Sequence, residues 1–204
     1  MGELYNDDPR LGDARLCGTT ASLCGIEKAR KDGDADAMEK ALRLDIMLHA
    51  FMFTMSGLPV LYSGDEVAQE NDNEYHSDPL KADDSRYLHR GNMDWKKAEL
   101  RHDETTVEGK LFAAIQRFEA LRADHLVFDG AADAWLLNTG NDHVLGIGRY
   151  NKGEKLLALF NFSDKEQIAW VNDPDRYADL LTGEETDAKS VTLPAGGFKW
   201  LFQE

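Results

Sequence analysis

One short apolar run constrains the fold of this chain more than any other feature of its sequence. Residues 58–62 read Leu-Pro-Val-Leu-Tyr and follow an apolar helical pattern that ends at Gly57. A continuous apolar run of this kind is typical of a buried parallel strand. Such a strand needs neighbours to satisfy its backbone groups, and the first half of the sequence offers no second one. We therefore expect this half to be part of a larger α/β fold, unless it packs against the second half or is completed by a second copy of the chain.

Helical patterns lie on both sides of this run. The longest begins at Asp36, which forms a capping-box signal with Glu39, and continues to about residue 55. Its second half is apolar on almost every side, which predicts burial on most of its surface. The opening residues 1–15 are rich in Gly, Asp, Pro and Arg and are expected to form a loop. A shorter helix is expected over residues 19–30. Another is expected over 106–123, where apolar residues form one stripe at helical spacing.

The sequence changes character after Asp124. Before that point, the polar stretch 67–105 predicts a long loop. After it, short apolar or alternating runs recur about every ten residues, with turn signals between them, which predicts an antiparallel β-sandwich. The runs cover residues 134–137, 144–150, 155–162, 167–171, 177–181, 190–193 and 198–202. We therefore expect an α+β chain with two domains, residues 1–125 and 126–204.

The composition limits the partners of the chain. Its 204 residues carry 38 acidic and 23 basic side chains, a formal net charge of −15. This charge disfavours nucleic acid and anionic membranes, because binding either needs clustered Lys and Arg, while a neutral sugar is compatible with it. The most apolar stretch, Ile46–Met55, is about half as long as a membrane span. Cys17 and Cys24 are expected two turns apart on a helix, too far for a disulfide. A reducing compartment and a cytoplasmic location follow as expectations.

Four segments carry a family pattern. They are Gly12-Asp13-Ala14-Arg15, residues 18–23, residues 56–66 ending in Gly-Asp-Glu, and residues 81–90 with Asp-Asp-Ser-Arg. Together they resemble amylosucrases, a branch of the α-amylase family of glycoside hydrolases. The first two resemble the stretch after the seventh barrel strand, the third the eighth strand, and the last the eighth loop. The resemblance implies the end of a (β/α)8 barrel, with its last helices and eighth strand, followed by the antiparallel β-sandwich as the C-terminal domain.

The resemblance also implies a chemistry. The family cleaves α-glucosidic bonds with retention, using a nucleophilic Asp and a Glu acid/base held close together. In the family these acids, and a third that follows a His, precede the region matched by Gly12. This sequence contains none of them, so no catalytic residue is assigned. The parent enzyme would act on sucrose or an α-glucan by glucosyl transfer or hydrolysis. The chain alone is expected to be inactive.

Two arginines are the substrate-binding candidates that the resemblance implies. Arg15 matches a family arginine near the sugar-binding acids, and Arg86 matches one that contacts the sugar beyond the cleavage point. A guanidinium group can bind sugar hydroxyls or hold a carboxylate ionised. The alternative for Arg15 is a salt bridge within a loop. The alternative for Arg86 is an internal pair with Asp83 or Asp84.

Three further polar residues lie in or near these segments, and the resemblance assigns them no firm role. Asn6 matches a family Asn beside the site, but its spacing to Gly12 differs. Asp65 and Glu66 follow the expected strand, at the end where barrels place their chemistry. They either shape the floor of the site or cap the following turn and pair with a barrel neighbour. We favour capping, because the family does not use this pair as its acid and nucleophile.

The remaining histidines, acids and tryptophans give no metal-ligand pattern. Five histidines are expected on exposed loops, namely His76, His89, His102, His125 and His143. His49 is expected in the core, and the acidic run 70–74 lacks a full calcium-binding loop. Trp135, Trp170 and Trp200 offer faces that suit sugar rings, although tryptophans on alternating strands more often belong to a core.

Two functions therefore stay open. The first is the C-terminal portion of an amylosucrase-like enzyme, whose partner is a sugar substrate. The second is a stand-alone, non-catalytic sugar-binding or interaction module built on the sandwich. Neither predicts a cofactor, metal, nucleic acid or membrane partner, and in both the chain is able to self-associate. The DNA upstream of Met1 distinguishes them, since only the first predicts an open frame that encodes the missing acids.

Overall fold

The computed structural model describes residues 2–204, which divide into two compact units. Of the described residues, one unit comprises 2–45 and Leu61–Ala114, and the other Ile46–Val60 and Ile115–Glu204. Two long helices, α3 (Ala35–Thr54) and α5 (Val107–Asp124), each contribute residues to both units. No helix among residues 2–204 is long and apolar enough to cross a membrane.

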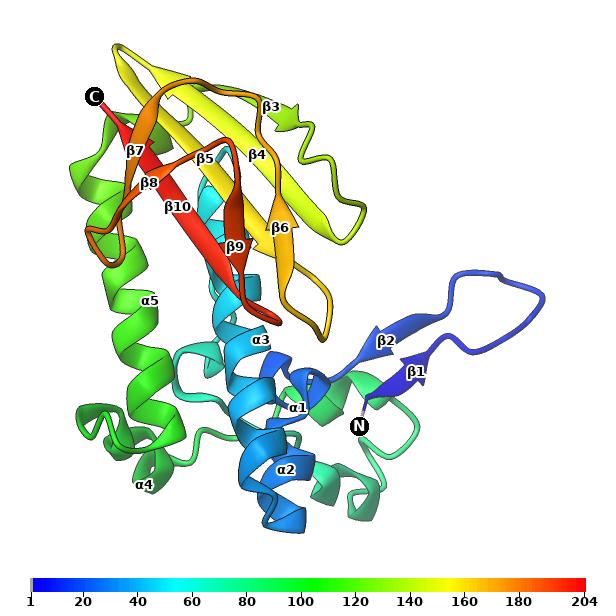
Figure 1. Cartoon of the computed structure of the whole chain (residues 1–204). Coiled ribbons are helices and arrows are strands. Elements are labelled where there is room, and N and C mark those ends of the chain that lie inside the picture. The colour runs from blue at the N-terminus through cyan, green and yellow to red at the C-terminus, as the bar shows by residue number, and fades with distance from the viewer. Residues whose placement is uncertain (1) are drawn as a thin grey trace. The chain divides into compact units, whose positions relative to one another are not determined.

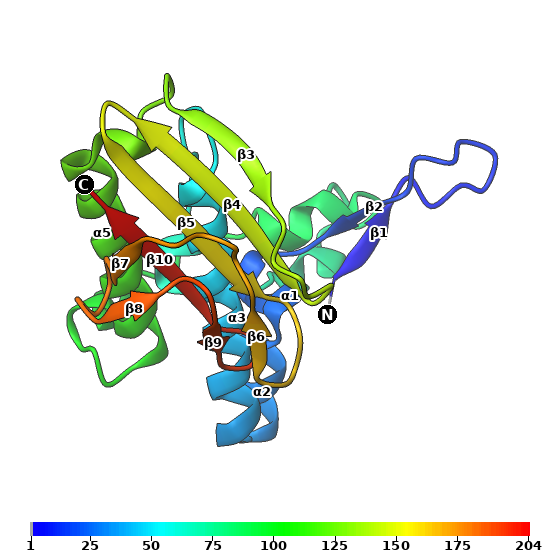
Figure 2. The ribbon, with the colours of Figure 1, turned by 45° about the horizontal axis from the view of Figure 1, so that its top comes forward.

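The second unit contains the predicted antiparallel sandwich (Figures 1 and 2). Its larger sheet has the strand order β3-β4-β5-β10-β7-β8, and a two-stranded sheet pairs β6 with β9. The strands are β3 (Asp133–Leu137), β4 (Val144–Asn151), β5 (Glu154–Asn161), β6 (Gln167–Ala169), β7 (Arg176–Asp179), β8 (Glu185–Asp187), β9 (Val191–Leu193) and β10 (Phe198–Gln203). Every pairing is antiparallel, so the all-antiparallel arrangement expected from the turn spacing is confirmed.

The two sheets share one apolar core. Val144 and Leu157 of the larger sheet belong to the same buried cluster as Ala169 and Leu193 of the smaller sheet. Strand β5 lies inside the larger sheet, between β4 and β10, and its residues 156–160 are all buried. Buried and exposed residues do not alternate along this strand, because both of its faces are covered.

Aromatic side chains cover the opposite face of the larger sheet. Phe51 of α3 meets Phe160 of β5 edge to face, with ring centroids 5.6 Å apart. The ring centroid of Phe118 of α5 lies 5.2 Å from that of Trp200 of β10. Trp200 is fully buried and donates its indole N–H to the hydroxyl of Thr54 at 2.9 Å, as a buried tryptophan requires. This tryptophan therefore belongs to the core.

Two arginines satisfy the backbone at the C-terminal end of α3. Arg149 of β4 is fully buried and donates to the carbonyl of Thr54 at 2.8 Å and to the Ser56 hydroxyl at 3.1 Å. Arg122 of α5 donates to the carbonyls of Phe53 and Gly57, at 2.6 Å and 2.5 Å. The last carbonyls of a helix have no partner within it and carry partial negative charge. The two guanidinium groups supply those partners, and burial lowers the pKa of both.

The first unit is helical and irregular, with one short hairpin. The hairpin pairs β1 (Glu3–Tyr5) with β2 (Arg15–Cys17). The helices and 3-10 turns of this unit are α1 (Thr20–Cys24), α2 (Ile26–Asp32), η1 (Asp65–Val67), η2 (Asn73–Ser77), η3 (Ser85–His89), α4 (Trp95–Ala98) and η4 (Glu99–His102). In the second unit, α5 is followed by η5 (Leu126–Phe128). The polar stretch predicted as one long loop is therefore a chain of short turns.

The structure corrects the expected strand at residues 58–62. These residues adopt no regular secondary structure, although they follow α3 as predicted. Leu58 is 92% exposed and Val60 78% exposed. An isolated extended segment has no ladder partner for its N–H and C=O groups, and residues 2–204 contain no parallel strand pair to supply one. The run is apolar, as the sequence shows, but the predicted strand is wrong. A strand would need neighbouring strands that residues 2–204 do not provide.

Smaller differences concern helix ends and the first residues. The helix expected over 19–30 is split at Gly25, whose φ of 104° suits glycine. The α3 helix begins with a bond from Ala37 N to the Asp34 carboxylate at 3.0 Å, so Asp34 is the cap in place of Asp36. The opening segment forms the β1–β2 hairpin, which was predicted as loop. Cys17 consequently lies on β2, whereas a helix was expected.

Candidate functional site

The candidate site is built where the β1–β2 hairpin meets the turn η3. Tyr5 and Arg15 are directly paired across the two hairpin strands, so their side chains share one face of the ribbon. The hydroxyl of Ser85, the first residue of η3, donates to the carbonyl of Leu4 at 3.0 Å. These contacts bring the segment that contains Arg86 against the hairpin that contains Arg15.

Arg86 lies over the ring of Tyr5. Its guanidinium carbon is 4.5 Å from the ring centroid, within the range of a cation–π contact. The same group forms a bidentate pair with Asp84, with Nε–Oδ1 at 2.8 Å and Nη2–Oδ2 at 2.7 Å. Hydrogen bonds from Arg86 lower the pKa of Asp84 to about 2, and the pair raises the pKa of Arg86. The internal pair that was the alternative for Arg86 is therefore present in the structure.

Arg15 is placed beside the same aromatic ring. Its side chain is exposed, and within residues 2–204 it makes no ion pair or hydrogen bond. The loop salt bridge weighed for Arg15 is thus absent from this described part of the chain. Tyr5 has Arg15 as its cross-strand neighbour and Arg86 over its ring. The two predicted arginines, 71 positions apart in the sequence, therefore meet at one tyrosine.

A buried tyrosine anchors the base of the hairpin. The Tyr75 hydroxyl donates to the carboxylate of Glu3, and His76 Nε2 lies 3.0 Å from the other oxygen of that carboxylate. The bond from Tyr75 lowers the pKa of Glu3. Burial, followed by the bond to Glu3, raises the pKa of Tyr75 to about 12. The Glu3 carboxylate is therefore held ionised and serves to fix β1 on η2.

The apolar segment after α3 ends close to the same turn. Tyr62 meets the ring of His89 edge to face at 5.7 Å, and burial lowers the pKa of this histidine. A neutral ring next to a tyrosine adds a second aromatic surface on η3. The site therefore combines tyrosine and histidine rings with exposed guanidinium groups. Rings stack on apolar ring faces, and guanidinium groups donate to hydroxyls or carboxylates.

The other polar residues near the site are used to shape the backbone. The Asn6 amide donates to Asp13 at 3.2 Å, inside the hairpin loop. Asp65 accepts from the N–H of Tyr62 at 3.2 Å, and Glu66 accepts from the N–H of Gly64 at 3.0 Å. Asp65 and Glu66 therefore bind the backbone just before them, whereas a cap on the following turn was expected, and η1 has no side-chain cap.

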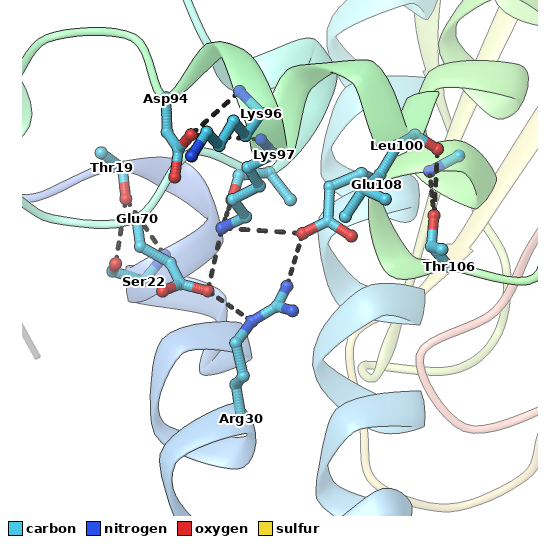
Figure 3. A network of polar contacts seen from close by, with 12 residues as sticks. Thr19, Ser22, Arg30, Glu70, Asp94, Lys96, Lys97, Leu100, Thr106 and Glu108 are labelled. Atoms are coloured by element: carbon cyan, nitrogen blue, oxygen red, sulfur yellow. Dashed lines mark hydrogen bonds and ion pairs between the residues drawn. The ribbon is translucent and has the colours of Figure 1, made fainter. Parts of the chain in front are cut away.

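A network of charges holds the loop that precedes η3 (Figure 3). Arg30 of α2 donates to Glu70 at 2.7 Å and to Glu108 of α5 at 2.6 Å. The Nζ of Lys97, in α4, lies 3.0 Å from Oε1 of Glu70 and 3.7 Å from Oε1 of Glu108. It also donates to the carbonyl of Ala68 at 2.9 Å. Glu108 is only 1% exposed, so both cations are needed to balance it.

This network also explains the acidic run 70–74. Glu70 pairs with two basic groups, and Asp72 caps η2 by accepting from Glu74 N at 3.0 Å. Asn73 donates to Glu27 at 2.9 Å. Residues 2–204 contain no group of three or more His, Cys, Asp or Glu side chains able to hold a metal ion. The side chains of the acidic run therefore hold the loop in place through ion pairs and hydrogen bonds.

The histidines and tryptophans differ in how much of their surface is exposed. His49 is buried, as expected. His102 and His143 are exposed, while His125 is half-buried against the ring of Phe202 at 4.5 Å. Trp135 and Trp170 keep 39% and 51% of their surface exposed, which differs from the core placement favoured for all three tryptophans and confirmed for Trp200.

Sequence reasoning missed the aromatic residues of the site. Tyr5 was assigned to a loop without a role, and Tyr62 was read only as the end of a strand. The alternation in residues 3–5 spans three positions, too few for a reliable strand signal. A turn signal, Asp-Asp-Pro within residues 7–9, was the available indication of a hairpin.

Comparison with known proteins finds solved structures of similar fold. No protein-family model matches the sequence. The solved structure of an α-amylase from Anoxybacillus is similar over 80% of this chain and 32% of that chain, with TM-score 0.55 and 20% identity. AmyP in complex with maltose is similar over 79% and 35%, with TM-score 0.63 and 16% identity. A maltogenic amylase from S. marinus is similar over 78% and 19%, with TM-score 0.53 and 22% identity.

These likenesses define the class of fold. The chain has an α+β fold, with helices followed by an antiparallel sandwich, that is similar to part of the Anoxybacillus α-amylase and of AmyP. Residues 2–204 form no closed barrel. It spans about a third or less of the length of the three proteins. Identities of this size establish the fold and leave the activity to be inferred.

Proposed function

We propose that this chain is the C-terminal portion of an α-amylase-family enzyme that acts on sucrose or an α-glucan by retaining glucosyl transfer or hydrolysis. The observation that carries the proposal is the shared fold, which extends over about four-fifths of this chain but only 19–35% of the three solved structures. The exposed apolar segment 58–62 supports it, because that segment lacks the neighbours that a barrel would supply. The maltose bound to AmyP supports an α-linked glucose unit as the substrate class.

The amylosucrase-like branch is the finer part of the proposal. It rests on the loop 81–90 and on the meeting of Arg15 and Arg86 at Tyr5. The Arg86 guanidinium lies over the Tyr5 ring, and Arg15 is the cross-strand neighbour of the same tyrosine, an arrangement that suits hydroxyl recognition on the acceptor or leaving-group side. Arg86 would keep its pair with Asp84, which fixes the plane of the guanidinium and leaves its other N–H groups to donate.

The chain alone is proposed to be inactive. The carboxylates around the candidate site are engaged in holding neighbours, namely Asp84 with Arg86, Glu3 with Tyr75, and Asp13 with Asn6. A retaining glycosidase needs a nucleophile and an acid/base about 5 Å apart, and the family resemblance puts both before the matched region. A cytoplasmic location and self-association of the isolated chain remain further parts of the proposal.

The test is to express the reading frame upstream of Met1 together with this chain. We expect turnover of sucrose or malto-oligosaccharides in the longer protein and none in the 204-residue chain. In the longer protein, Arg86→Ala should lower kcat/KM about 10- to 100-fold, as loss of a buried charged hydrogen bond to substrate does. Arg10→Ala is the matched control, because Arg10 pairs with Asp8 in the same i, i+2 geometry on an exposed loop. Turnover by the isolated chain would contradict the assignment.

A stand-alone sugar-binding module is the second candidate. It is favoured by the closed apolar core of the second unit and by the exposed aromatic side chains on that unit. A promoter and ribosome-binding site directly before Met1, with sugar binding but no turnover, would support this candidate over the first.

A further inference from the structure

The second unit has a surface hollow at the loop between β3 and β4. Residues 137–145 and Phe162 line it, with a volume of about 460 Å³. We call it the β3–β4 hollow. Its volume falls in the range of small-ligand sites, about 300–1,000 Å³. Figures 1 and 2 show the loop beside β6, and two bonds from Asn141, to Gln167 at 2.8 Å and to the carbonyl of Ile168 at 3.0 Å, tie it there.

The loop is held rigidly by its own polar groups. The Thr139 hydroxyl donates to the carbonyl of Val144 at 2.8 Å, and the Asn138 side chain accepts from Gly140 N at 3.0 Å. The Asn141 side chain accepts from His143 N at 2.9 Å. A loop fixed in this way loses little conformational freedom when it binds a ligand.

Three polar side chains on this rigid loop have unused hydrogen-bonding capacity. Within residues 2–204, the Asp142 carboxylate and the His143 ring make no hydrogen bond or ion pair, and the Asn138 amide nitrogen donates none. They line the same hollow as Phe162, a residue that is 49% exposed and whose N–H donates to the carbonyl of His143 at 3.0 Å. Acceptors, donors and an aromatic ring therefore share one small surface.

The chemistry of the hollow selects for a neutral, hydroxyl-rich ligand. None of its lining residues is Lys or Arg, and the chain carries a net charge of −15, so an anion is disfavoured. An apolar ligand would leave Asp142 and Asn138 without partners in a covered surface. A pyranose ring offers an apolar face to the aromatic ring and hydroxyls to a carboxylate and an amide. Trp170 packs its ring against Gly140 and is exposed beside the loop, which enlarges the aromatic surface.

We propose that the β3–β4 hollow binds a segment of a neutral α-glucan, with a glucose ring on Phe162 and its hydroxyls on Asp142, His143 and Asn138. The aromatic and polar groups define a sugar site by themselves. The choice of an α-linked glucan rests on the proposed function. Such a site would hold a long glucan on the sandwich and would raise the local concentration of substrate for the parent enzyme.

The test is a titration of the 204-residue chain with maltoheptaose, followed by amide chemical shifts. We expect shifts confined to the loop 138–143 and Phe162. Phe162→Leu removes the ring but keeps apolar bulk, and Asp142→Asn removes the charge but keeps the shape. Each should weaken binding about fivefold, the scale of one stacking contact or one hydrogen bond. Dispersed amide spectra check that each variant folds.

Tyr150→Leu is the matched control, because Tyr150 is an exposed aromatic residue at the other end of β4 and should leave binding unchanged. Equal weakening by all three variants, shifts located elsewhere, or no shifts in millimolar excess of maltoheptaose would overturn the site. Equal binding of cellohexaose would overturn the α-glucan assignment. The readout needs no turnover, so failure here is separable from failure of the longer protein to cleave sucrose.

Discussion

The Asp84–Arg86 pair makes one side chain of the candidate site unusually acidic. Its two hydrogen bonds hold the carboxylate ionised, and the pKa of Asp84 falls from 3.8 to about 2. A lowered folded-state pKa adds stability that is present above the unfolded value and is lost as pH falls towards the folded value. The contribution of this pair should therefore disappear between about pH 4 and pH 2.

We expect the Asp84 carboxyl to titrate with a midpoint near 2 in carbon-detected NMR. Arg86→Met should return the midpoint to the ordinary range of an aspartate, because the first cause of the shift is the bond to Arg86. Asp103, whose carboxyl pKa is lowered by hydrogen bonds from Thr105 and does not depend on Arg86, serves as the internal reference. An unchanged Asp84 midpoint in Arg86→Met would show that the pair is not formed in solution.

Arg149 is a buried cation that binds several backbone carbonyls of the second unit. It is fully buried, and its guanidinium donates to the carbonyls of Thr54, Val127 and Asp129 at 2.7–2.8 Å. Arg149→Met fills similar space but leaves these carbonyls without donors. Since each unsatisfied buried group costs about 1–3 kcal/mol, we expect a loss of at least about 3 kcal/mol in the free energy of unfolding. Urea denaturation followed by tryptophan fluorescence measures it.

The exposed Arg176, which pairs with Glu185 at 3.3 Å on the surface, is the control for this prediction. Arg176→Met should change the free energy of unfolding by no more than about 1 kcal/mol, the usual limit for a surface pair. Equal effects of the two substitutions would mean that burial of Arg149 is not what makes it important.

At the scale of elements, α3 and α5 are held at their ends by side chains from elsewhere in their own units. The C-terminal end of α3 receives Arg122 and Arg149. The first turn of α5 carries Glu108, which binds Arg30 of α2 and Lys97 of α4 (Figure 3). A carboxylate in the first helical turn also suits the positive end of the helix dipole.

Glu108→Gln should destabilise the first unit, because Arg30 and Lys97 then share only Glu70 as an acidic partner. Breaking a buried ion pair costs about 3–5 kcal/mol, and partial exposure of Arg30 places the expected loss nearer 2 kcal/mol. Amide hydrogen exchange in α2 and α5 measures the loss locally. Glu104→Gln is the matched control, since Glu104 is an exposed acid just before the same helix. A double-mutant cycle with Arg30→Met isolates the pair itself.

At the scale of the whole molecule, the apolar residues 58–62 pair with no strand among residues 2–204. Leu58 and Val60 expose almost all of their apolar surface in this chain. Leu58→Asp with Val60→Lys should therefore change the stability of the 204-residue chain by less than about 0.5 kcal/mol, as exposed substitutions do. In the longer protein the same pair should prevent folding or lower the melting temperature strongly, because the segment would be a buried strand.

Leu80→Asp is the control, since Leu80 is as exposed as Leu58 but lies outside the proposed strand. It should have no effect on either protein. Thermal unfolding of the two proteins and their variants gives the comparison. If the Leu58→Asp, Val60→Lys variant of the longer protein unfolds at the same temperature as the unchanged protein, residues 58–62 are not a buried barrel strand there.

The sequence alone determined the parts of this protein that local pattern specifies. The α5 helix, the apolar half of α3 and seven strands of the sandwich were predicted within a few residues, because their periodicity and turn residues act over short distances. The tertiary structure decided what depends on contacts far apart in the chain. It placed Arg15 opposite Tyr5 on the hairpin and Arg86 over the Tyr5 ring, buried Trp200 but exposed Trp170, and left residues 58–62 outside any sheet. A strand's hydrogen bonds belong to its neighbours, so the same five apolar residues form a strand only where another segment pairs with them.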